Sequence, residues 1–174
     1  TADAMHTQVE TAKAIAERGA DYLLAVKGNQ ESLHESVQSY FAPVRAGDTT
    51  CTKGQVRFCR HTLNSRGVVE ERRCWTTTDV AFIDPTGRWT QARTFVCVQR
   101  KVFKAGVLTG EQIRYFVSSA TGSPHRFLRA TRLHWGIENS QHWRLDVFFR
   151  EDDSRVRTGQ AATNLATLRR LAFG

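Results

Sequence analysis

The sequence contains neither a long apolar run nor a leader-like beginning. No stretch reaches the roughly 18 consecutive apolar residues of a membrane-spanning helix, and no charged segment precedes a short apolar one. The chain also begins at Thr1, without an initiator methionine. We therefore expect no membrane partner and interpret the chain as a soluble, intracellular piece of a longer protein.

The four cysteines include no C-x-x-C pair. Cys51, Cys59, Cys74 and Cys97 stand 8, 15 and 23 positions apart, whereas a close pair is the usual mark of a zinc or redox site. We predict that they are reduced residues of the core or of strands in a cytosolic protein. The sequence also shows no internal repeat and no low-complexity tract.

Acidic residues are scarce relative to basic ones. The 174 residues hold 25 Lys and Arg against 17 Asp and Glu, a net charge of +8, and 20 of the bases are Arg. Because arginine forks match phosphate oxygens, this excess predicts a polyanionic partner. The positive charge lies after the first quarter of the chain: the net charge is −3 for residues 1–43, +7 for residues 44–120 and +4 for residues 121–174. With 40% hydrophobic residues the chain can bury a core, which excludes a disordered or fibrous protein.

The first quarter of the chain has the pattern of an α/β layer. Apolar residues recur at helical spacing over residues 9–18, before Gly19, and again over residues 30–41, where Pro43 predicts the end of the helix. Between them, the continuous apolar run at 22–26 is typical of a strand buried on both faces of a parallel sheet. Strands and helices alternating at this pitch indicate an α/β fold.

From about residue 44 the pattern changes to short alternating runs. They predict an antiparallel β region with one solvent-exposed face, in strands at 56–61, 68–75, 93–98 and 113–119. Turn residues separate these strands at 76–78, 84–87 and 105–106. From Pro124 onward the spacing is helical again, with a break between two helices at 154–159.

Potential metal ligands recur every four residues near the end of the chain, at His134, Glu138, His142 and Asp146, with Asn139 beside Glu138. On a helix, residues spaced in this way share one face. The same spacing also fits a solvated face with ion pairs, or a structural network of histidines and carboxylates. A zinc hydrolase would require H-E-x-x-H, which is absent, although two histidines of one helix can ligate zinc together with a third ligand from elsewhere.

Asp3 is the second candidate. It precedes the first predicted helix, at what would be the carboxyl end of a strand, where α/β sheets bind their ligands. A helix cap or a turn would explain an aspartate there equally. Lys27 and Asn29 end the apolar run at 22–26 and would share the same edge of the sheet as Asp3.

Several segments of the chain carry a resemblance. They are Asp3-Ala4-Met5-x-Thr7-Gln8, Asp21-Tyr22-x-Leu24-Ala25-x-Lys27-Gly28-Asn29-Gln30, Arg66-Gly67-Val68-Val69-Glu70-Glu71-Arg72, His134-Trp135-Gly136-Ile137-Glu138-Asn139, His142-Trp143-x-Leu145-Asp146-Val147, Phe149-x-Glu151-Asp152-x-x-Arg155 and Asn164-Leu165-Ala166 with Leu168-Arg169-Arg170-Leu171-Ala172. Together they resemble the DDE transposases of bacterial insertion sequences, in the subgroup that includes the H-repeat-associated proteins. Arg66 stands where that subgroup's strand has histidine, and Leu145 where other relatives have lysine.

The resemblance implies an α/β fold: a ribonuclease-H-like core, incomplete at the N-terminus, with an antiparallel β-rich insertion and C-terminal helices. It divides the chain into part of the core at 1–43, the insertion at 44–120, and a helical return to the core at 121–174. In such enzymes three carboxylates hold two Mg²⁺ ions, for which Mn²⁺ can substitute, so that water or a DNA 3′-hydroxyl attacks a phosphodiester. By position, Asp3 resembles the second of these carboxylates and Glu138 the third.

The first carboxylate would lie upstream of Thr1, so we expect the chain by itself to have little or no activity. For the longer protein, the resemblance implies cleavage and strand transfer at the ends of an insertion sequence. Its partners would be double-stranded DNA, both element ends and target, and further copies of itself in a synaptic complex. Its location would be the bacterial cytoplasm, at the nucleoid.

The resemblance implies that arginines of this chain contact DNA. Those of the β region alternate with apolar residues and could present one basic face to DNA phosphates, namely Arg57, Arg60, Arg66, Arg72 and Arg73. On the approach to Glu138, the corresponding residues are Arg126, Arg129 and Arg132. Trp75 and Trp89 fit core positions better than stacking on DNA. Two alternatives stay open: a non-catalytic DNA-binding remnant, and a zinc hydrolase that uses His134 and His142.

Overall fold

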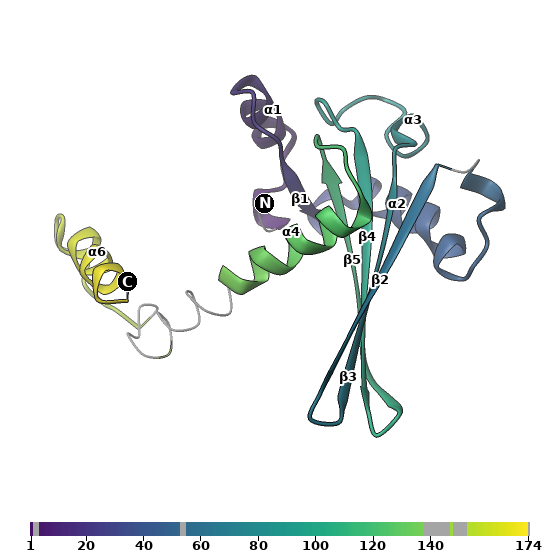
Figure 1. The fold of residues 1–174 in the computed structure, drawn as a ribbon. Helices are drawn as coiled ribbons and strands as arrows, with labels where there is room; N and C mark the ends of the chain where they lie inside the picture. Colours follow the sequence, from purple (N-terminus) through teal and green to yellow (C-terminus); the bar gives the residue numbers. More distant parts are fainter. Residues whose placement is uncertain (2–3, 53–54, 138–146, 148–152, 174) are drawn as a thin grey trace. The chain divides into compact units, whose positions relative to one another are not determined.

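A computed structural model describes residues 1, 4–52, 55–137, 147 and 153–173 of the chain. The described part divides into two compact units, residues 1–130 and residues 131–174. The first unit contains a five-stranded sheet and most of the helices (Figure 1). The predicted segment boundaries after residues 43 and 120 stay predictions.

One antiparallel sheet organises the first unit, with its strands in the order β1-β5-β4-β3-β2. Its strands are β1 (Leu23–Val26), β2 (Val56–Ser65), β3 (Val68–Thr77), β4 (Thr94–Lys104) and β5 (Val107–Ser118). Two-residue turns close the β2–β3 and β4–β5 hairpins, at Arg66-Gly67 and Ala105-Gly106, all four residues having positive φ. Such turns match the twist of the paired strands.

Two hydrophobic clusters lie on opposite faces of this sheet, at one end of its strands. On one face, α1 (Val9–Glu17) and α2 (Glu31–Arg45) supply buried residues such as Ala12, Val37 and Phe41, which pack against Phe95 and Val117 of the sheet. On the other face, the first turns of α4 (Pro124–Ile137) pack through Phe127 and Leu128. This second cluster continues into the sheet through Leu23, Cys74, Val96, Val98 and Phe116.

The four long strands continue beyond the helices (Figure 1). We call residues 60–73 and 100–113 the strand arm. In β3 the buried residues are Cys74 to Thr77, and in β5 they are Tyr115 to Ser118, whereas the arm residues of both strands are half-buried or exposed. The sequence predicted one exposed face along the whole β region. That prediction is wrong for β3, β4 and β5, because in these strands burial changes along the length: one end is buried and the arm is mostly half-buried or exposed.

The predicted parallel sheet around residues 22–26 is also corrected. β1 pairs antiparallel with β5, from Leu23 opposite Ser118 to Val26 opposite Tyr115. β1 is nevertheless buried on both faces, since Leu24 and Val26 belong to one hydrophobic cluster and Leu23 to the other. A continuous apolar run reports that double burial and not the direction of the neighbouring strand.

Two predicted ends were also wrong. α2 passes through Pro43 and ends at Arg45, because Val44 is buried beside Phe41 and this packing holds the last turn in place. β3 continues through Thr76 and Thr77, which the sequence assigned to a turn; both residues pair with β2 and β4. The predicted helices at 9–18 and from Pro124, and the turns at 84–87 and 105–106, are confirmed.

The cysteine prediction is confirmed where the side chains are described. Cys59, Cys74 and Cys97 are free, buried and on strands, and Cys51 lies in the short helix η3 (Thr50–Thr52). Trp75 and Trp89 are core residues as well: Trp75 packs against Phe58 with ring centroids 5.2 Å apart. Both indole rings are therefore buried in the hydrophobic core, as the sequence predicted.

The second unit contains the end of α4 and the helix α6 (Ala161–Phe173), which follows the predicted break at 154–159. Leu168 and Leu171 of α6 are exposed. None of the described helices has both the length and the apolar character needed to cross a membrane.

The buried thiol of Cys97 predicts how stability changes at high pH. Burial raises its pKa from about 9 to about 12. In the folded chain the thiol therefore keeps its proton at a pH where the unfolded chain has lost it, and the free energy of unfolding falls as the pH rises from about 9 to 12. Urea unfolding across this range measures the fall. A Cys97→Val variant, similar in volume but unable to titrate, is expected to lose stability less steeply; identical pH profiles would contradict the prediction.

Candidate functional site

The segment that follows Asp3 is held against the carboxyl end of β1. The short helix η1 (Ala4–His6) leads into Thr7, whose hydroxyl donates a hydrogen bond of 2.7 Å to the carbonyl of Ala25. The Asn29 amide donates to the carbonyl of Ala4 at 2.6 Å and also contacts that of Thr7 at 3.4 Å. Asn29 therefore fixes the residue adjacent to Asp3.

Gln30 adds two hydrogen bonds to the same segment. We call the hydrogen bonds of Asn29 and Gln30 to residues 4–8 the amide clamp. Its amide nitrogen donates to the carbonyl of Thr7 at 3.0 Å and to the side-chain oxygen of Gln8 at 3.1 Å. Asn29 and Gln30 both lie in the short helix η2 (Gly28–Gln30), directly after β1. The sequence predicted that Asn29 lies near Asp3 but did not reveal the hydrogen bonds that Thr7 and Gln30 contribute. Their signal was the composition of the segments on the two sides of β1, which hold Thr7 and Gln8 before the strand and Asn29 and Gln30 after it.

The predicted site residues are distributed unevenly over the described part of the chain. Lys27 is exposed at the start of η2, and His134 is half-buried in the last turn of α4. Five predicted residues lie outside the described part: Asp3, Glu138, Asn139, His142 and Asp146. Their roles and mutual geometry stay predictions. Among the residues that are described, no group of three or more His, Cys, Asp or Glu side chains could hold a metal ion.

Acidic side chains neutralise much of the strand arm. On the face that carries α4, Glu70 accepts from Arg100 in a bidentate pair of 3.0 and 3.2 Å and also contacts Arg72. On the opposite face, Glu71 accepts from Arg73 at 2.7 Å and lies 3.6 Å from Arg60. Both glutamates are half-buried, whereas Arg60 and Arg100 are exposed, so these pairs are only partly shielded from water.

The predicted DNA contacts therefore fall into two groups. Arg60, Arg72 and Arg73 form ion pairs within the sheet. The other five arginines are exposed: Arg57 on β2, Arg66 in the β2–β3 turn, and Arg126, Arg129 and Arg132 on α4. Arg126 also donates to the carbonyl of Thr121 at 2.8 Å. Alternation in the sequence could not separate the two groups, because it does not show which strand places a carboxylate opposite each base.

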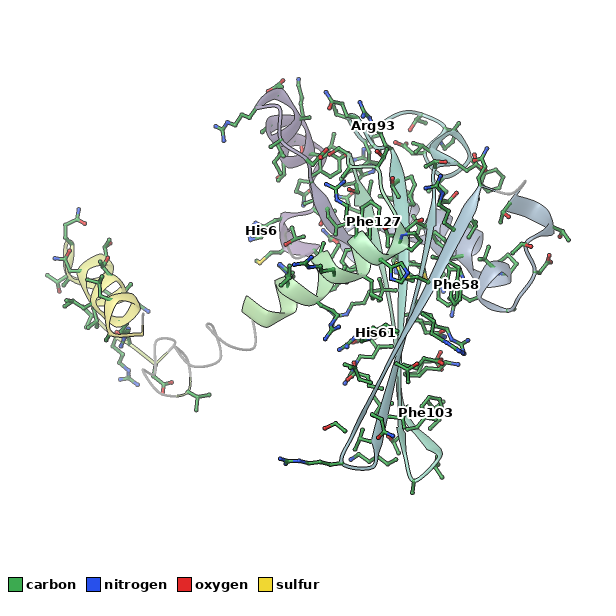
Figure 2. The ribbon with its side chains drawn as sticks, in the orientation of Figure 1. His6, Phe58, His61, Arg93, Phe103 and Phe127 are labelled. Carbon is green, nitrogen blue, oxygen red and sulfur yellow. The ribbon has the colours of Figure 1, made fainter. Side chains whose placement is uncertain are left out.

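A polar pocket of about 500 Å³ lies on the α4 face of the sheet, at the end away from the arm. Phe127 marks that end in Figure 2, whereas His61 and Phe103 lie farther along the strands. The lining comes from β2, β3, β4 and the loop before α4, and consists of Gln55, Arg57, Thr76, Thr78, Thr94, Thr121 and Gly122. Of these, the sequence singled out Arg57 alone, because the threonines read as turn and strand residues.

The chain matches a family model described as a transposase DDE domain over residues 1–173. It therefore belongs to the DDE transposase domain family. It is 36% identical over 180 residues to "Putative transposase YncI" of Escherichia coli O157:H7, and 33% identical over 179 residues to "H repeat-associated putative transposase YhhI" of Escherichia coli K12. The family resemblance carried by the motifs is thus confirmed.

These alignments include 99% of this chain but only 44% and 46% of the two relatives, so the chain spans less than half of their length. No solved structure matches the chain. The antiparallel sheet with its helices is consistent with an α/β fold, and the ribonuclease-H-like core stays a prediction.

The amide clamp predicts the effect of removing Asn29. An Asn29→Ala variant loses the bond to the Ala4 carbonyl, and at about 1 kcal/mol for a typical hydrogen bond the whole unit should remain folded. We expect amide exchange of residues 4–8 to accelerate several-fold while exchange in β4 is unchanged. Hydrogen-exchange mass spectrometry makes this comparison, with Gln38→Ala on the exposed side of α2 as the control. Equal exchange of residues 4–8 in both variants would contradict the clamp.

Proposed function

We propose that this chain is the part of a DNA transposase that supplies two of three catalytic carboxylates, Asp3 and Glu138. The family match over residues 1–173 carries the proposal, because DDE domains are built around such carboxylates. The reaction is cleavage of a DNA phosphodiester followed by strand transfer at the ends of an insertion sequence. Because the chain spans less than half the length of its relatives, we propose that the remaining carboxylate belongs to another part of the longer protein, and that the 174 residues alone cleave little or no DNA.

The donor set suits a divalent metal. Asp3 and Glu138 offer hard carboxylate oxygens, which Mg²⁺ prefers and Mn²⁺ accepts. When bound, such ions stabilise charge on the attacking and leaving oxygens of the phosphodiester. The contribution proposed for the described residues is orientation: Asn29 donates to the carbonyl of Ala4, the residue that follows Asp3 in the sequence. Lys27 and His134 are proposed neighbours of this site, together with Asn139, His142 and Asp146.

The proposed substrate is double-stranded DNA, both element ends and target. The net charge of +8 and the exposed arginines of β2 and α4 favour a polyanion. Contacts to phosphates would position the strand without reading its bases, and would make binding dependent on salt. Pairing of two element ends requires two copies of the protein, which is why we also propose self-association in the DNA complex.

Replacing either proposed carboxylate tests the reaction. In the protein expressed from the whole reading frame, Asp3→Asn and Glu138→Gln should each lower Mg²⁺-dependent nicking of end-bearing DNA by at least about a hundredfold, while DNA binding is kept. Gel assays of nicked product measure the rate, and Glu17→Gln, which removes an exposed charge on α1, is the control. Either variant nicking at the wild-type rate would refute its assignment. Binding without nicking in the unmodified protein would instead indicate a DNA-binding remnant.

The ion pairs of the strand arm make a separate prediction. A Glu71→Gln variant removes the carboxylate shared by Arg60 and Arg73, so two bases become available to phosphates. We expect DNA affinity to rise several-fold at low salt and the gain to shrink as salt increases. Fluorescence anisotropy with labelled duplex measures the affinity. Glu35→Gln, at an exposed glutamate of α2 that forms no ion pair with the described residues, makes the same change in net charge away from the arm, so an equal gain in both variants would exclude a specific effect of unpairing.

A further inference from the structure

The pocket on the α4 face is built from two adjacent rows of the sheet. In one row Arg57 of β2 lies opposite Thr76 of β3. In the next row, at the end of the strands, Gln55, Thr78 and Thr94 line the same space. Thr121 and Gly122 close it from the loop before α4. The lining therefore brings an arginine, an amide and four threonine hydroxyls together, with no carboxylate among them.

The hydroxyls of this pocket differ in whether the protein already uses them. Thr94 is buried and donates to the carbonyl of Ala120 at 2.8 Å. Thr76 is equally buried, with 3% of its surface exposed, yet no residue in the described part of the chain hydrogen-bonds to its hydroxyl. The Thr76 oxygen is nevertheless not among the buried polar atoms that lack a partner, so it is open to the space of the pocket that Thr76 lines. In that pocket the hydroxyl is available to a ligand, which would replace water as its hydrogen-bond partner.

Charge points to the class of ligand. Arg57 is exposed and forms no ion pair with the described residues, in contrast to Arg60 three positions later. The 14-residue helix α4 begins two residues after Gly122, and its amino end carries partial positive charge. A guanidinium group beside several hydroxyl donors is complementary to a tetrahedral oxyanion, since the oxygens of a phosphodiester only accept hydrogen bonds.

We propose that this pocket binds a phosphate group, supplied by the backbone of DNA. This inference rests on the proposed function, because that function makes DNA the available phosphate source. Arg57 donates its fork to the phosphate oxygens, and Thr76 and Thr78 add hydroxyl donors. The contact is independent of base sequence and fixes the position of the duplex relative to β2 and the start of α4.

Two variants of the full chain test the site with DNA. Arg57→Gln removes one cation, so the slope of log affinity against log salt should become shallower by about 0.9, the value for one phosphate on duplex DNA. Thr76→Val keeps the β-branched shape and removes a neutral donor, so affinity should fall several-fold with the slope unchanged. Arg88→Gln is the matched control, because Arg88 is exposed and lies outside the pocket lining. Equal affinity and slope for Arg57→Gln and Arg88→Gln would overturn the assignment to DNA.

Inorganic phosphate provides the second arm. Titrated into the unmodified chain, it should shift the NMR amide signals of Thr76, Thr78 and Gly122, and Arg57→Gln should abolish these shifts while Arg88→Gln keeps them. Absence of shifts in the unmodified chain would overturn the pocket as a phosphate site. Shifts in a chain that binds no DNA would support the pocket but refute DNA as the substrate. Shifts together with DNA binding that Arg57→Gln leaves unchanged would assign the pocket to free phosphate and overturn the DNA source.

Discussion

The pairing of β1 with the end of β5 is the constraint on which the rest of the first unit depends. Tyr22 and Ser119 lie 97 positions apart, and the amide of Tyr22 donates to the hydroxyl of Ser119 at 2.9 Å. The hydroxyl of Ser118 donates to the carbonyl of Tyr22 at 2.6 Å. This junction joins the strand that holds the Asp3 segment to the strand that leads into α4.

The charge of the chain is organised by the sheet and not by the sequence order of its bases. Glutamates at the centre of the arm neutralise the arginines beside them, whereas Arg57 on β2, Arg66 in the β2–β3 turn and the arginines of α4 are exposed and form no ion pair with the described residues. The net charge of +8 therefore does not show which of the bases are free of carboxylate partners. Affinity for a polyanion would be concentrated where bases lack carboxylate neighbours.

Several features of this molecule could be predicted from local sequence. The helix at 9–17 and the turn at Ala105-Gly106 follow from spacing and turn residues, and the motifs indicated the family now confirmed. The prediction of a parallel sheet was wrong because a continuous apolar run indicates burial and not strand direction. The predicted helix end at Pro43 was wrong because the packing of Val44 outweighs the loss of one backbone hydrogen bond. The pocket was missed for a different reason: its residues come from four segments that only the strand register brings together. The proposed carboxylates, Asp3 and Glu138, lie outside the described residues, so their roles stay predictions.

The two tight turns of the sheet have a consequence for how the chain folds. β2 with β3, and β4 with β5, meet after loops of two residues, so both hairpins can form early at little entropic cost. β1 has only four residues and must find β5 across most of the first unit. We therefore expect β1 and residues 4–8, which contact it through Thr7, to dock last on a preformed four-stranded sheet. The part of the domain that carries the proposed chemistry would then also be the first to detach when stability is lost.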